Sequence, residues 1–228
     1  MMLGHNTLES PIVFDEMGVN YLVVENRKQM TQYVYELAGG IENQEGGFTL
    51  SDNNEIMDMS RSAELILNPF ALDPNSTATI NCLLQKMKFD ALSDYQLRTD
   101  EMISMINSTI GKIVSEQHHS VGFSENLDII KLFKFLGVRF DDVCESLLEN
   151  ICEYMLVMRD YSNTKLFIFI NLRSFLDEDE LQELYRFAMY NKLSILLMES
   201  NVFERSSCEK VRLIDKDLCE IGENTHNY

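Results

Sequence analysis

The sequence predicts an α/β protein whose sheet is rich in parallel strands and whose core is interrupted by an inserted, extended α-helical subdomain. The first observation is a strand, a helix and a strand in succession: two nearly continuous apolar runs, Thr164–Asn171 and Leu193–Glu199, enclose a helical pattern at Asp177–Asn191. Such runs are typical of strands buried on both faces. A unit of this kind is normally right-handed, with its two strands parallel. The second observation is a helical periodicity confined to the middle of the chain.

The N-terminal part predicts short strands and one helix. The β-branched and aromatic runs Pro11–Asp15 and Tyr21–Glu25 lie between turn residues, as strands do. A helix is expected from Arg27 to Ala38, because Gly39-Gly40 follows and glycine favours helix ends. Further strands are expected at Phe48–Ser51 and Glu64–Leu67, between turns rich in Gly and Asn.

The middle part predicts two helices. Asp73-Pro74 has the pattern of an N-cap followed by proline at the first helical position. Apolar residues then recur at helical spacing, and after a break near Ser93-Asp94 a second helix is expected from about Thr99. Its apolar stripe consists of Met102, Ile103, Ile106, Ile110, Ile113 and Val114. We therefore expect a helical subdomain at 76–117 between the two parts of an α/β core, 1–75 and 118–228, with helices allowed to extend into 118–160.

The remaining C-terminal pattern predicts a short helix at Leu127–Leu136, which Gly137 ends, and a longer amphipathic helix at Val143–Met158. The segments Val211–Asp215 and Asp217–Ile221 are expected to form a terminal hairpin.

Charge is the unusual feature of the composition. The chain has 19 Lys and Arg against 37 Asp and Glu, a net charge of −18. The excess lies in the flanks: residues 1–75 carry 3 basic and 12 acidic side chains and residues 118–228 carry 12 and 20, whereas residues 76–117 carry 4 and 5. A polyanion such as nucleic acid is not expected to bind the whole surface of this protein. Binding would have to use a local basic surface.

The sequence also indicates a cytoplasmic protein. Its five cysteines are odd in number and form no C-x-x-C pair, which is typical of reduced thiols. No run of about 18 apolar residues could span a membrane, and Met1–Ser10 lacks the basic and apolar regions of a secretory signal.

Signatures of common catalytic sites are absent. The sequence has no G-x-x-x-x-G-K-[ST] phosphate loop, and its Gly111-Lys112 falls inside the second predicted middle helix. The turn after Tyr21–Glu25 is Asn26-Arg27-Lys28, with no glycine that would let the backbone approach a phosphate. The G-x-S-x-G and H-E-x-x-H patterns of hydrolases are missing as well. Nucleotide hydrolysis is therefore disfavoured.

Acidic clusters admit two interpretations. Asp177-Glu178-Asp179-Glu180 could hold a hard cation, but it opens a helix with the spacing of a capping box. Glu116, Glu125 and Asp128 surround the start of the Leu127–Leu136 helix, where oxygen ligands from a loop and a helix start would suit Ca²⁺. Helix capping is the alternative for this group too.

Basic residues are few, so their grouping matters. Lys86 and Lys88 fall at the end of the first middle helix, Lys112 belongs to the second, and Lys131 and Lys134 are spaced i, i+3 on the next helix. They are either solvated helix faces or, if they converge, a local positive surface on an acidic protein.

Four blocks in the C-terminal half carry a resemblance to a known family. They are IIKLFKFLGVRFD (Ile129–Asp141), LFIFIN (Leu166–Asn171), the DEDEL…SILLME block (Asp177–Glu199) and IDKDLCEIGEN (Ile214–Asn224). These blocks resemble the short Csn-two family, the CRISPR-associated spacer-acquisition proteins of type II-A systems. The similar order of elements extends over most of the chain and is weakest from Gly39 to Ala63.

The resemblance implies a core similar to P-loop ATPases without a working phosphate loop, an extended helical domain and no catalytic activity. It implies a homotetrameric ring, held in shape by Ca²⁺, through which double-stranded DNA threads from its ends independently of sequence. The partners it implies are the CRISPR spacer integrase and the RNA-guided effector nuclease.

For this chain, the residues assigned to DNA contact are Lys28, Lys86, Lys88, Lys112, Lys131 and Lys134. The residues assigned to Ca²⁺ are Glu116, Glu125 and Asp128. Relatives carry a denser acidic stretch where this chain has His118-His119-Ser120-Val121-Gly122-Phe123-Ser124, so fewer or weaker calcium sites are expected here. Two alternatives remain: a protein-interaction scaffold that does not bind DNA directly, and a degenerate P-loop protein that still binds nucleotide.

Overall fold

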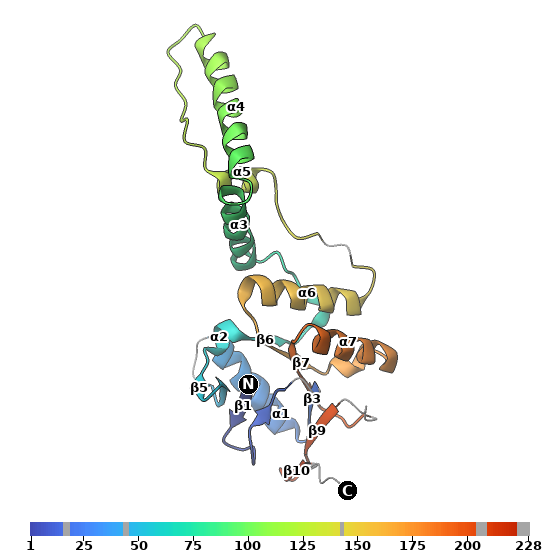
Figure 1. Cartoon of the computed structure of the whole chain (residues 1–228). Helices are drawn as coiled ribbons and strands as arrows, with labels where there is room; N and C mark the ends of the chain where they lie inside the picture. The colour runs from blue at the N-terminus through green and yellow to red at the C-terminus, as the bar shows by residue number, and fades with distance from the viewer. Residues whose placement is uncertain (16–18, 43–45, 142–143, 204–208, 223–228) are drawn as a thin grey trace. The chain divides into compact units, whose positions relative to one another are not determined.

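The computed structural model describes residues 1–15, 19–42, 46–141, 144–203 and 209–222 (Figure 1). The chain divides into two units. The first contains Met1–Asp73 and Val143–Tyr228, and the second contains Pro74–Asp142. The helical subdomain predicted at 76–117 lies within the second unit.

The first unit is built on a largely parallel sheet. Its strand order is β10-β9-β3-β8-β7-β6, and β9, β3, β8, β7 and β6 run parallel to their neighbours while β10 is antiparallel to β9. The strands are β3 (Val19–Val24), β6 (Ala63–Ile66), β7 (Leu166–Ile170), β8 (Ser194–Glu199), β9 (Glu209–Ile214) and β10 (Glu220–Gly222). The predicted α/β class, the parallel β7–β8 pair and the terminal hairpin are thus confirmed.

The two faces of this sheet are covered by different layers. Tyr21, Phe167 and Leu197 belong to one core cluster, with helices α6 (Leu147–Ser162) and α7 (Glu178–Tyr190). Their sequence neighbours Leu22 and Ile168 belong to the other, with α1 (Arg27–Ile41). This alternation is the period of two of a strand that is buried on both sides.

A small antiparallel sheet, β2-β1-β4-β5, shares the second cluster with α1. Its strands are β1 (Met2–His5), β2 (Ile12–Val13), β4 (Phe48–Asp52) and β5 (Glu55–Ile56). The short elements α2 (Met59–Ser62), η1 (Pro69–Ala71) and η2 (Leu172–Ser174) complete the first unit.

Several predicted helix boundaries differ from the structure. The helix predicted at Val143–Met158 is α6 at Leu147–Ser162, because the Ser146 hydroxyl caps it by accepting a hydrogen bond from Glu149 N at 3.1 Å; Val143 itself lies outside the described residues. The second middle helix begins at Gln96 rather than near Thr99.

Two further boundaries are wrong. Helix α1 does not stop at Gly39-Gly40 but continues to Ile41, because Gly39 is buried within the helix and a Cβ on Gly40 would lie 3.4 Å from the sulfur of Met59. These glycines permit close packing rather than a helix end. The first middle helix begins at Thr77, not after Asp73-Pro74, because the Ser76 hydroxyl caps it by accepting a hydrogen bond from Thr79 N at 3.2 Å.

The second unit contains α3 (Thr77–Leu92), α4 (Gln96–Ser115) and α5 (Ile129–Phe135). Helix α3 contacts both α4 and α5, and an extended segment returns beside α4 (Figure 1), where Asn107 Nδ2 donates a hydrogen bond to the Glu125 carbonyl at 2.8 Å. Gly137 ends the region of α5 as expected, in the left-handed conformation at φ +69°.

The second unit buries little of its apolar surface. Both core clusters lie in the first unit. Among the described residues of the second unit, the buried apolar side chains are those of Pro74, Leu84 and Ile129. Part of the predicted stripe on α4 is exposed, with Ile113 at 52%. None of the helices in the described part of the chain combines the length and hydropathy needed to cross a membrane.

Candidate nucleic-acid interface

Five of the six lysines predicted to contact DNA lie in the second unit. Lys86 and Lys88 are on α3, Lys112 is on α4, and Lys131 and Lys134 are on α5. All are exposed except the half-buried Lys88. The sixth, Lys28, is exposed in the first turn of α1 and belongs to the first unit.

The helix geometry brings only some of these lysines onto a shared face. Lys131 and Lys134 are three residues apart on α5 and therefore neighbours on its surface. Lys86 and Lys88 are two residues apart on α3, about 200° around its axis, so they leave the helix on different faces. The structure thus places one lysine pair on α5 and distributes the other lysines over the helices.

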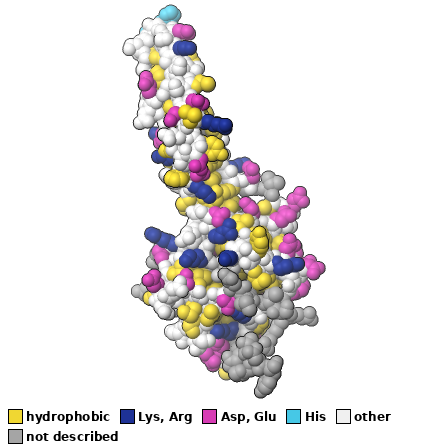
Figure 2. Space-filling model, viewed as in Figure 1, with side chains coloured by type: hydrophobic (Ala, Val, Ile, Leu, Met, Phe, Trp, Pro, Cys, Tyr) yellow, Lys and Arg dark blue, Asp and Glu magenta, His cyan; other side chains and the backbone are white. Residues whose placement is uncertain are grey.

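Charge separates the two units. The second unit has 7 Lys and Arg against 9 Asp and Glu, and the first has 12 against 28. Figure 2 shows many Asp and Glu side chains along one side of the first unit. An approaching polyanion therefore meets a nearly neutral surface on the helical unit and a strongly repulsive one on the α/β unit.

The three predicted calcium ligands are not grouped. Glu116 is the C-cap of α4, and Glu125 lies on the extended segment. Asp128 caps α5, with its Oδ1 accepting hydrogen bonds from the backbone N–H groups of Ile130 at 3.0 Å and Lys131 at 3.4 Å. Within the described ranges, no three His, Cys, Asp or Glu side chains gather as a metal-binding group. The capping alternative holds for Asp128.

A different set of oxygen donors surrounds Glu125. It lines a surface hollow with Asp100, Ser104, Asn107 and Ser108. Carboxylate, amide and hydroxyl oxygens fit calcium in kind, but calcium takes six to eight oxygens and this hollow offers only two carboxylates. Sequence reasoning missed Asp100 because its neighbour Glu125 is brought to it by the returning segment.

Capping also accounts for the acidic run at the start of α7. Asp177 accepts a hydrogen bond from Glu180 N, and the Glu180 carboxylate accepts one from Asp177 N, both at 2.9 Å. This reciprocal pair is the predicted capping box.

The turn after β3 is closed to phosphate. The Asn26 side chain accepts hydrogen bonds from Lys28 N and Gln29 N, both at 3.1 Å, and so caps α1. A phosphate loop needs such backbone N–H groups for its ligand. Asn26 occupies two of them, which agrees with the missing glycines.

A buried ionic cluster follows the ends of β7 and β8, and sequence reasoning did not find it. The Glu199 side chain is fully buried and accepts a hydrogen bond from Arg173 N at 3.0 Å. Burial is the main cause that raises the pKa of Glu199 to about 7, while the backbone N–H and the charge of Arg173 oppose it. The Arg173 guanidinium pairs with Glu209 at 2.5 Å and Glu178 at 3.3 Å and lies over the Tyr21 ring.

Comparison with known proteins decides the family. A family model described as "CRISPR-associated protein (Cas_Csn2)" matches residues 41–218, well over half of the chain. The chain belongs to this family. The predicted resemblance is thereby confirmed, and the protein is a CRISPR-associated member of an adaptive immunity system.

Two curated relatives agree with this assignment. A CRISPR-associated protein Csn2 from Enterococcus faecalis is 23% identical over 208 residues, covering 90% of this chain and 92% of the relative. Another, from Streptococcus agalactiae, is 26% identical over 127 residues, covering 54% of this chain and 56% of the relative. The first match spans both units of the present chain.

Proposed function

We propose that this protein is a non-catalytic, homotetrameric ring that binds the ends of double-stranded DNA during CRISPR spacer acquisition. It would act beside the spacer integrase and the RNA-guided effector nuclease. The observation that carries the proposal is the charge partition in a chain of this family: 7 basic against 9 acidic side chains in the helical unit, and 12 against 28 in the α/β unit.

The partition supports a restricted, sequence-independent mode of binding. Duplex DNA carries one negative charge per about 1.7 Å, so the acidic α/β unit repels it. The exposed lysines of the helical unit provide phosphate contacts, which position DNA without reading bases. Lys86, Lys88, Lys112, Lys131 and Lys134 are the proposed contacts there, and Lys28 is the proposed contact on the α/β unit.

Assembly is supported by the apolar surface of the helical unit. A unit that buries little of its own apolar surface gains free energy by burying it against another copy. We propose that other copies in the ring cover a set of strongly exposed apolar side chains: Phe89 at 71%, Leu97 at 73%, Met105 at 71%, Phe135 at 86% and Leu136 at 65%.

We also propose that calcium binds to the assembled ring, with ligands from more than one copy. Glu125 and Asp100 would supply oxygens from one copy, and the remaining ligands would come from elsewhere in the ring. The capped turn after β3 supports a core that is similar to P-loop ATPases but does not bind nucleotide phosphate.

The decisive experiment compares linear duplex with a covalently closed circle of the same sequence. Gel shifts in calcium and in chelator, run beside a sizing measurement, should show a calcium-dependent tetramer that retains linear DNA and releases the circle. Equal retention of linear and circular DNA would refute the proposal that DNA enters the ring from its ends.

A scaffold function is the second candidate, because the α/β unit carries 28 acidic side chains that could dock on basic partner proteins. It predicts no shift of linear duplex in calcium, together with a stable complex with the integrase or the effector nuclease.

A further inference from the structure

A cavity of about 380 Å³ lies at the amino ends of the parallel strands, and none of the proposed DNA contacts lines it. Val19 begins β3, Lys165 directly precedes β7 and Ser194 begins β8, and all three line it. Phe14 and Leu193 contribute a buried apolar wall. This volume is at the small end of the range for ligand pockets.

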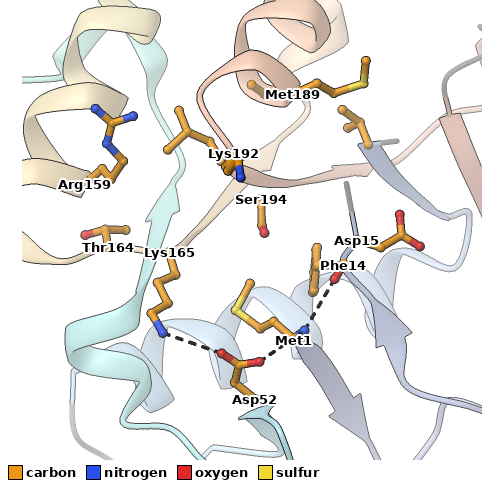
Figure 3. A pocket seen from close by; sticks show the side chains of 13 residues that line it. Met1, Phe14, Asp15, Asp52, Arg159, Thr164, Lys165, Met189, Lys192 and Ser194 are labelled. Carbon is orange, nitrogen blue, oxygen red and sulfur yellow. Dashed lines mark hydrogen bonds and ion pairs between the residues drawn. The ribbon is translucent and has the colours of Figure 1, made fainter. Parts of the chain in front are cut away.

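Three basic side chains line this cavity: Arg159, Lys165 and Lys192 (Figure 3). Carboxylates pair with some of the cations at this cavity but are outnumbered by them. Asp160 pairs with Arg159, with Nε and Oδ1 2.7 Å apart. Asp52 lies 3.7 Å from Lys165 and 3.5 Å from the terminal amine, and Asp15 pairs with Lys210. In a chain with about twice as many acidic as basic residues, this local excess of positive charge runs against the composition.

The position of one of these cations, Arg159, is explained by a nearby helix C-terminus. Helices α6 and α7 both end near the cavity, and cations favour helix C-termini. Arg159 serves in this way, because its Nη1 donates a hydrogen bond to the carbonyl of Asn191, the C-cap of α7, at 3.3 Å.

Backbone geometry sets Lys192 apart. It is left-handed at φ +55°, directly after α7. Lys192 N donates to Met189 O at 3.2 Å and Leu193 N to Ala188 O at 2.9 Å, the hydrogen bonds of a Schellman motif. Glycine is the usual residue at this position, since a side chain there is strained. A lysine kept in a strained conformation at the wall of a basic cavity indicates a function for its side chain.

We propose that this cavity binds a phosphate monoester with a small apolar or aromatic group. The phosphate would lie against Arg159, Lys165 and Lys192, with the Ser194 hydroxyl as a further donor, and the organic group against the wall of Phe14 and Leu193. A phosphate monoester carries nearly two negative charges and three acceptor oxygens, which several cations and hydroxyl donors match better than a single carboxylate would. A site for a small ligand goes beyond the proposed DNA binding.

The test uses the full-length protein without DNA at low ionic strength, with calorimetric titration of phenyl phosphate, inorganic phosphate, benzoate and phenol. Phenyl phosphate should bind most tightly, inorganic phosphate more weakly, and phenol not at all. Lys165→Ala and Lys192→Gly should each weaken phenyl phosphate by about tenfold. Lys216→Ala removes the same charge from an exposed residue outside the cavity and should leave the affinity unchanged.

Lys192→Gly separates binding from folding. Glycine suits the left-handed position, so this variant should keep or raise the melting temperature while it loses the ligand. A gel shift of linear duplex should be unaltered in Lys192→Gly, which keeps this proposal independent of DNA binding. No saturable binding of phenyl phosphate, wild-type affinity in both lysine variants, or equal affinity for benzoate would overturn it.

Discussion

Replacing Glu199 with glutamine should reduce the loss of stability that we expect of the wild-type protein between pH 6 and 8. Glu199 ends β8 and is fully buried, and one of its carboxylate oxygens has no hydrogen-bond partner among the residues that the structure describes. Burial raises its pKa from the ordinary 4.5 to about 7. The folded protein therefore holds the proton of this carboxyl group more tightly than the unfolded chain does.

The sign and size follow from this difference. Because the folded pKa is the higher one, the contribution of Glu199 to the free energy of unfolding is full below pH 4.5 and is lost as pH rises through 7. At 1.36 kcal/mol per pKa unit, the complete loss is on the order of 3 kcal/mol. About 1 kcal/mol of it falls between pH 6 and 8.

Urea unfolding at pH 6, 7 and 8, with protein concentration and salt held constant, measures this loss. The wild-type protein should lose stability across the series, and the loss should be about 1 kcal/mol smaller in Glu199→Gln. All other titratable groups are common to both proteins, so the difference between them isolates Glu199. Glu178→Gln is the matched control, because Glu178 also pairs with Arg173 but its side chain is 54% exposed. Coincident slopes for wild type and Glu199→Gln, or an equal change in the control, would refute the reasoning.

Three further predictions concern packing, DNA contact and capping. Gly47→Ala should destabilise the protein by about 1–3 kcal/mol in urea unfolding, because the new Cβ would collide with the Glu36 carboxylate and with the buried His5 ring, which are paired at 2.6 Å. Gly122→Ala, with nothing within 4 Å, should stay within about 0.5 kcal/mol. The double change Lys131→Ala and Lys134→Ala should lower the slope of log affinity against log salt by roughly 2 in DNA titrations, and an unchanged slope would remove both from the interface. Asp177→Ala should cost about 1 kcal/mol through the lost cap of α7, which the unfolding midpoint would report.

The parts of the fold that sequence predicts well are those with a strong local pattern. The β7–α7–β8 unit combines continuous apolar strands with a capping box, and the structure has all three elements within about two residues of their predicted bounds. Strand β1, by contrast, was not predicted. Met2–His5 includes a glycine and becomes a strand because it pairs with β4 and β2, which lie later in the chain. Such pairing leaves no signal in four residues.

The candidate site, like the fold, has features that local sequence predicts and features that only the folded structure reveals. Each lysine could be assigned to its helix from periodicity, but which lysines share a face depends on helix phase and packing. Lys86 and Lys88 are only two residues apart in the sequence, but they leave α3 in different directions. The Arg173–Glu199–Glu209 cluster is assembled from segments that meet only in the folded sheet, so no spacing in the sequence reveals it.

The distance over which charges interact determines what the net charge of −18 means for DNA binding. At physiological ionic strength, exposed charges are screened beyond about 8 Å, so a phosphate responds to the side chains near it and not to the total of the chain. The relevant balance is therefore that of each surface, 7 against 9 for the helical unit and 12 against 28 for the α/β unit. An acidic α/β unit then has a use in the proposed DNA binding, because it disfavours contact between the duplex and that unit and leaves the helical lysines as the preferred contact. The same reasoning makes the basic cavity at the amino ends of the strands significant: within the acidic unit, its three cations form a local exception that a small anion can reach and a duplex cannot enter.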